Sequence, residues 1–137
     1  MNDEFWGLLH DGAIEAIRGE IQGVVSIEIS VRYLRDQFPG AGTGFRVDLR
    51  DCGELVYKEY DSPPLTDFEA IVASAPEIVG VEVGTPVVIH CVMGILTLSY
   101  RAASISLDTG ERVTFDELAA ASKAYWDAWA ARIPAKK

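Results

Sequence analysis

The chain has 137 residues, of which 49 % are hydrophobic, and carries a formal net charge of -9. This length suits one domain with a single core, and the hydrophobic fraction excludes an intrinsically disordered chain. The charge disfavours nucleic acids and anionic membranes as partners, because both are bound mainly through lysine and arginine patches. We therefore expect a single soluble domain over residues 1–137, with no nucleic acid and no membrane among its partners.

No targeting segment is expected. The residues Met1-Asn2-Asp3-Glu4 are acidic, and no small-residue cleavage pattern follows them, so the sequence predicts no secretory signal. The longest apolar tract, 84–98, contains a proline and a glycine and is shorter than the roughly 20 residues that cross a bilayer. We expect a cytoplasmic protein in which Cys52 and Cys91 are free thiols.

Strands are expected where apolar residues alternate with polar ones or form short runs between turn residues. The clearest strand is 24–33, where every second residue from Val25 to Tyr33 is apolar. The segments expected as strands are 13–18, 24–33, 45–50, 55–60, 78–83, 86–92 and 95–107. Asp51-Cys52-Gly53 marks either a hairpin turn or a bulge. A shift of the apolar phase places a bend near Ala102-Ala103.

Helices are expected in four places. Asn2 or Asp3 caps a short helix that ends before Gly12, and one helical turn covers 34–38. Thr66, with Glu69 three residues later, predicts a capping box and a short helix. Thr114, with Glu117 three residues later, predicts a second capping box, and the long helix that follows carries an apolar stripe on one face. The stripe comprises Phe115, Leu118, Ala119, Tyr125, Trp126, Trp129 and Ile133.

The stripe favours docking of this helix on the sheet, because an antiparallel sheet has a face to cover. A ligand groove or a partner surface is the alternative interpretation. The pattern as a whole predicts an α+β, mainly β fold. We expect a curved or barrel-like, mostly antiparallel sheet of seven or eight strands, with the C-terminal helix packed on it.

Two motifs resemble functional sequences but lack their context. Gly40-Ala41-Gly42-Thr43-Gly44 is followed by a strand and contains no lysine, whereas a phosphate loop leads into a helix. Asp108-Thr109-Gly110 matches the tripeptide of aspartic proteases, which need two such aspartates sharing a proton. We interpret both segments as turns.

The histidines and cysteines form no recognised reactive or metal-binding spacing. His90 and Cys91 are neighbours in an expected strand and point to opposite faces, so they cannot act together as base and nucleophile. We expect no catalytic residue, no metal and no cofactor. The alternative interpretation is a small-molecule-binding or hydrolytic β-barrel with a pocket in the sheet interior near His90, Cys91 and Tyr100.

The negative charge is concentrated between residues 51 and 82, where eight acidic residues face a single base, Lys58. Such a segment is commonly a solvated surface, but it also suits a basic partner. We expect partner-binding carboxylates here, and the candidates are Glu54, Glu59, Asp61, Asp67 and Glu69.

The segment from Phe5 to Gly12, with Tyr33-Leu34-Arg35 and Ala124-Tyr125-Trp126-Asp127, resembles a set of small bacterial proteins of unassigned function. A strand opened by Leu9-His10-Asp11 is similar to some antitoxin or immunity proteins that neutralise secreted toxins. Neither resemblance implies a catalytic residue. Together with the acidic segment, the second implies a non-enzymatic interaction protein, with an immunity-like inhibitor of a basic protein as its most concrete form. The sequence makes no prediction of oligomeric state.

Overall fold

The computed structural model describes residues 3–132, which form nine strands and four helices. The strands are β1 (Ala13–Gly19), β2 (Val25–Ser30), β3 (Gly44–Arg50), β4 (Glu54–Glu59), β5 (Ile78–Glu82), β6 (Val87–Cys91), β7 (Gly94–Ser99), β8 (Ala102–Leu107) and β9 (Arg112–Val113). The helices are α1 (Phe5–Leu8), α2 (Arg32–Arg35), α3 (Phe68–Ala73) and α4 (Phe115–Ala131). The expected α+β, mainly β fold with a long C-terminal helix is confirmed.

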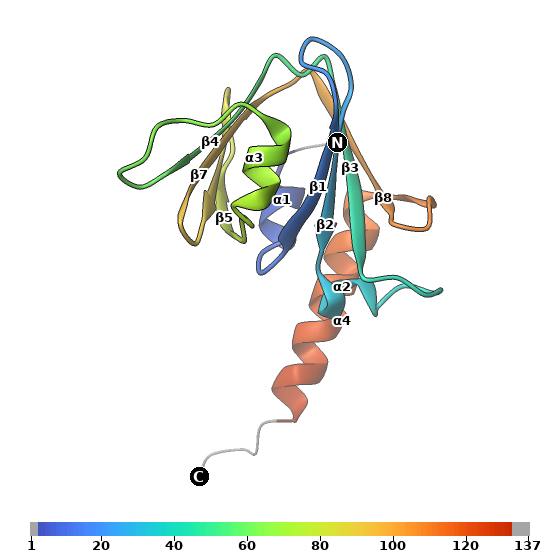
Figure 1. Cartoon of the computed structure of the whole chain (residues 1–137). Helices are drawn as coiled ribbons and strands as arrows, with labels where there is room; N and C mark the ends of the chain where they lie inside the picture. Colours follow the sequence, from blue (N-terminus) through green and yellow to red (C-terminus); the bar gives the residue numbers. More distant parts are fainter. Residues whose placement is uncertain (1–2, 133–137) are drawn as a thin grey trace.

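The strands lie in two antiparallel sheets (Figure 1). Sheet A has the order β1-β2-β3-β8-β9, and sheet B has the order β4-β7-β6-β5. Within residues 3–132 the two sheets do not close into a barrel, although one isolated bridge joins Ala13 to Glu77, next to β5. Across the same residues, no helix has both the length and the apolar character needed to span a membrane.

One long pair of strands connects the sheets. β3 pairs with β8 in sheet A, and their continuations β4 and β7 pair in sheet B. At the junction the Arg101 amide donates to the Arg50 carbonyl at 2.9 Å, and the Gly53 amide donates to the Ser99 carbonyl at 2.8 Å. Residues 51–53 therefore form a bend between sheets and not a hairpin turn, because β3 and β4 do not pair. The bend that we expected near Ala102-Ala103 lies between β7 and β8, just before Ala102.

The core lies between the inner faces of the sheets. In β2, Val25, Ile27 and Ile29 are buried while the residues between them are partly exposed, so the alternation read from the sequence is the burial pattern of the strand. Trp6 of α1 is fully buried, and its indole N–H donates to the Tyr100 hydroxyl at 3.1 Å.

Strand β2 is shorter than predicted. The alternation continues to Tyr33, but the strand ends at Ser30 and α2 begins at Arg32, two residues before the expected helical turn. The physical reason is a distant partner: the helical turn directs the Arg35 side chain to Asp108, where its Nε donates to the carboxylate at 2.9 Å. Arg35 is completely buried there.

Two predicted helix caps are wrong. The N-cap of α3 is Asp67, whose carboxylate accepts from the Ala70 amide at 3.0 Å, so Thr66 does not form the expected capping box. The N-cap position of α1 is Glu4, with no side-chain cap. Asp3 instead accepts a hydrogen bond from the Tyr100 hydroxyl at 2.5 Å, and Asn2 lies outside the described residues.

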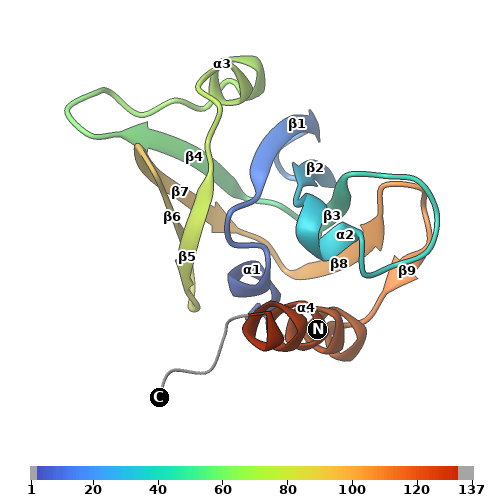
Figure 2. The ribbon, with the colours of Figure 1, turned by 90° about the horizontal axis from the view of Figure 1, so that it is seen from below.

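The C-terminal helix α4 is core in its first half only. The capping box of Thr114 and Glu117 is confirmed. The helix contacts α1 and α2 (Figure 2), and Leu118 is fully buried. Further along, α4 extends past the sheets (Figure 1), and the side chains of Trp126 and Trp129 are 38 % and 46 % exposed. The expected docking of the stripe therefore holds for the first half of α4, and the second half extends beyond the surface that covers the helix. Ile133 lies outside the described residues.

Candidate functional site

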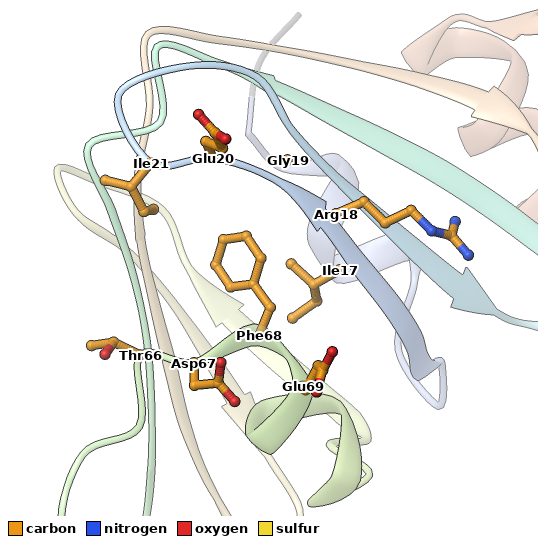
Figure 3. A pocket seen from close by; sticks show the side chains of 9 residues that line it. All are labelled: Ile17, Arg18, Gly19, Glu20, Ile21, Thr66, Asp67, Phe68 and Glu69. Carbon is orange, nitrogen blue, oxygen red and sulfur yellow. The ribbon is translucent and has the colours of Figure 1, made fainter.

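A groove separates the free edge of sheet A from α3. β1 is the edge strand of the sheet, and α3 packs beside it. Between them lie two adjoining cavities of about 510 and 330 Å³, which are wide open to solvent and share four lining residues. We call this feature the α3–β1 groove; it is lined by residues from 15–21 on one side and from 66–73 on the other. Figure 3 shows the residues that line the larger cavity.

The floor of the groove is apolar. Ile17 of β1 lies opposite Ile27 of β2 and is only 8 % exposed, so its side chain belongs to the inner face of the sheet. Phe68 opens α3, and its ring points towards Ile17 across the groove (Figure 3). Ile21, in the turn after β1, is 40 % exposed at the end of the same surface. The groove therefore offers apolar area that solvent reaches.

The rim of the groove is acidic. Its carboxylates are the exposed residues Glu15, Glu20, Asp67 and Glu69. Arg18 is the basic lining residue, but its side chain points away from the groove (Figure 3) and pairs with Glu28 on β2. Within residues 3–132, Glu15, Glu20 and Glu69 make no ion pair with a basic side chain. The negative charge of the rim is therefore not neutralised internally.

The five candidate partner-binding carboxylates of the acidic segment do not lie together in the structure. Asp67 and Glu69 line the groove. Glu54 begins β4 and accepts a hydrogen bond from the Ser99 hydroxyl at 3.2 Å, while Glu59 ends the same strand. Asp61 follows in a turn, with a φ of 61°. These three are not among the lining residues of the groove.

Two groove carboxylates, Glu15 and Glu20, were missed by sequence reasoning. Glu15 sits at a bulge in β1, where the register with β2 shifts between Ile14 and Ala16. Glu20 lies in the turn that follows β1. The sequence around these two glutamates does not mark them as part of a site, because only the packing of α3 against β1 brings them beside the acidic segment.

The residues of the alternative pocket have three different settings. His90 Nε2 lies 2.5 Å from a Glu82 carboxylate oxygen, and the imidazole is 40 % exposed. The Cys91 side chain is buried, and burial raises the pKa of its thiol to about 11. The Tyr100 hydroxyl is bonded to Asp3 and Trp6, and burial followed by the bond to Asp3 raises its pKa. None of the three lines the α3–β1 groove.

Asp108, of the protease-like tripeptide, lies at the surface and forms an ion pair with the buried Arg35; we call this pair the Arg35–Asp108 clasp. One carboxylate oxygen accepts from Arg35, and the other accepts from the amides of Thr43 and Gly44 at 2.8 and 3.1 Å. Burial alone would raise the pKa of Asp108, but these hydrogen bonds outweigh it and hold the pKa below its ordinary value. The clasp also explains the glycine-rich segment, which folds over this carboxylate.

The described residues contain no group of three or more His, Cys, Asp and Glu side chains arranged to hold a metal ion. No protein-family model matches the chain, and neither the curated proteins nor the solved structures include a significant match.

Proposed function

We propose that this protein binds a basic partner protein through the α3–β1 groove, as a non-enzymatic inhibitor of the immunity type. One observation carries the proposal: an apolar floor formed by Ile17 and Phe68 lies between carboxylates that have no basic partner within residues 3–132. Apolar contact would supply affinity, and the rim would supply charge complementarity.

The charge of the whole molecule acts in the same direction. A net charge of -9 attracts a cationic protein, and a cleft lined by one sign of charge concentrates that attraction locally. Such steering accelerates association and weakens as salt is added, since the Debye length is about 8 Å at physiological ionic strength. An inhibitor that must find its target quickly benefits from both effects.

A small-molecule or hydrolytic site in the sheet interior has less support. The inner face is filled by side chains such as Ile27, Val47 and Leu96, each fully buried. The Cys91 thiol, with its pKa raised to about 11 by burial, is a poor nucleophile at neutral pH. The cavities that carry the proposal lie between β1 and α3, not between the sheets.

The test is capture of the partner from the native host, followed by rate measurements on two matched charge-reversal variants. The groove variant is Glu15→Lys, Glu20→Lys and Glu69→Lys. The control variant, with the same change in charge elsewhere, is Glu54→Lys, Glu59→Lys and Asp61→Lys. We expect the groove variant to slow association with a basic partner at least tenfold at low salt, and the control to change it much less.

Any other outcome would place the binding site elsewhere on the protein or contradict the proposal. Loss of binding in the control alone would place the partner on the β4 side of the molecule. Equal binding by both variants, or capture of an acidic partner, would contradict the proposal. Asp67 is left unchanged in both variants because its carboxylate caps α3.

A further inference from the structure

The α3–β1 groove has two compartments of different chemistry. The first, of about 510 Å³, lies near the turn after β1 and is bordered by Glu20, Asp67 and Glu69. The second, of about 330 Å³, continues towards the other end of β1, and most of its lining surface is apolar, although Glu15, Arg18 and Glu69 also line it. Ile17 and Phe68 line both, so the two compartments are continuous across one floor.

Deepening the function proposed above, on which this inference rests, we propose that the partner contributes one short amphipathic segment to the groove. The segment places an aliphatic side chain in the second compartment and a cationic side chain over the carboxylates of the first. The recognised feature is thus a lysine or arginine within a few residues of a leucine-like side chain, and not positive charge alone.

The second compartment selects an aliphatic side chain because of what lines it. Val72 and Ala73 present methyl groups and Phe68 presents a ring, whereas the carboxylates of Glu15 and Glu69, which also line this compartment, are exposed to solvent. A cationic head group placed among the methyl groups would lose hydration, and those groups offer it no hydrogen-bond acceptor. A leucine-like side chain instead gains by leaving water, because its apolar surface is removed from solvent.

The first compartment selects a cation for the opposite reason. Glu20 and Glu69 are exposed acceptors, and the Phe68 ring between them offers a face on which a lysine or arginine stem can lie. Asp67 adds negative charge, although one of its oxygens is used by the Ala70 amide. A purely apolar segment would leave the carboxylates of the first compartment without a cation. A purely cationic segment would leave the second compartment empty.

The experiment uses two synthetic peptides of equal charge, acetyl-Lys-Lys-Ser-Leu-Ser-Lys-Lys-amide and the same peptide with serine in place of leucine. Cations on both sides of the central residue make the test independent of the direction in which the segment binds. We expect the leucine peptide to bind the full chain roughly tenfold more tightly than the serine peptide in isothermal titration calorimetry at moderate salt.

Two variants separate the compartments. Ala73→Phe, which narrows the second compartment, should reduce the affinity of the leucine peptide to that of the serine peptide and leave the latter unchanged. Glu20→Lys with Glu69→Lys should weaken both peptides. If Ala73→Phe lowers the melting temperature, the smaller change Ala73→Met replaces it in the comparison.

The results distinguish failure of the inference from failure of the function. Equal affinity of the two peptides for the unmodified protein, or no binding of either, would overturn the amphipathic segment, while the capture experiment would still decide the function. A leucine preference that persists when Glu20 and Glu69 are reversed, with no loss of affinity, would contradict both the cation subsite and the proposed electrostatic function.

Discussion

The Arg35–Asp108 clasp and the α3–β1 groove use the same kinds of charged residue with opposite results. In the clasp the guanidinium is fully buried, and both carboxylate oxygens accept hydrogen bonds from within the chain. In the groove the carboxylates of Glu20 and Glu69 are exposed and lack a basic partner among the described residues. The difference suggests that charge satisfied internally maintains the fold, whereas charge left unsatisfied at a concave apolar surface is available to a partner.

The largest effect is expected in the clasp. Arg35→Ala should lower the free energy of unfolding by about 3 to 5 kcal/mol, because the fully buried guanidinium donates several hydrogen bonds, and a hydrogen bond to a charged group is worth about 1.5 to 3 kcal/mol. It also removes the hydrogen bonds that hold the carbonyls of Phe38 and Pro39. Denaturant unfolding measures the loss, with Arg46→Ala as the control, since Arg46 forms an exposed pair. Equal losses in the two variants would show that the clasp contributes no more than a surface pair.

The next largest effect is expected in α4, where a buried residue of the helix can be compared with an exposed one. Leu118→Ala should cost about 2 to 5 kcal/mol, because Leu118 is fully buried and its removal leaves a cavity. Trp126→Ala should cost clearly less, since the indole is 38 % exposed and packs chiefly against His10, Tyr33 and Tyr125. Thermal melts of both variants test this order. A larger loss from the tryptophan would restore the view that the whole stripe is core.

A smaller, pH-dependent effect is expected from Asp108→Asn. The pKa of Asp108 is lowered in the folded protein, so its contribution is fully present above the unfolded-state value of about 3.9 and disappears as pH falls through the folded value. At neutral pH the variant should be less stable by about 1 to 3 kcal/mol. The gap should narrow in urea melts below about pH 4. A gap that stays constant with pH would contradict this assignment.

The smallest effect on stability is expected in the groove. The variant carrying Glu15→Lys, Glu20→Lys and Glu69→Lys should change the free energy of unfolding by no more than about 0.5 kcal/mol per site, because these side chains are exposed. The same variant is expected to bind a basic partner poorly, so stability and binding should separate. A strongly destabilised variant would mean that the rim is structural, as the clasp is.

Most features set by neighbouring residues were predictable from the sequence, with the Thr66 capping box as an exception, and those set by distant contacts were not. The Thr114 capping box depends on four consecutive residues and was predicted correctly. The end of β2 was misplaced because it depends on Arg35 reaching Asp108. In the groove, local charge nominated Asp67 and Glu69, but only the tertiary packing brings Glu20 beside them. The exposure of Trp126 was missed because periodicity does not show where the covering surface ends.

The ladder that runs from β3 and β8 into β4 and β7 has a consequence for how the molecule loses its structure. Residues 44–59 and 94–107 stay paired on both sides of the bend, so each sheet is anchored to the same two lengths of chain. Melting one sheet would leave those strands without their neighbours in the other. The two sheets are therefore expected to unfold in a single cooperative transition, with a common midpoint whichever sheet a spectroscopic probe reports.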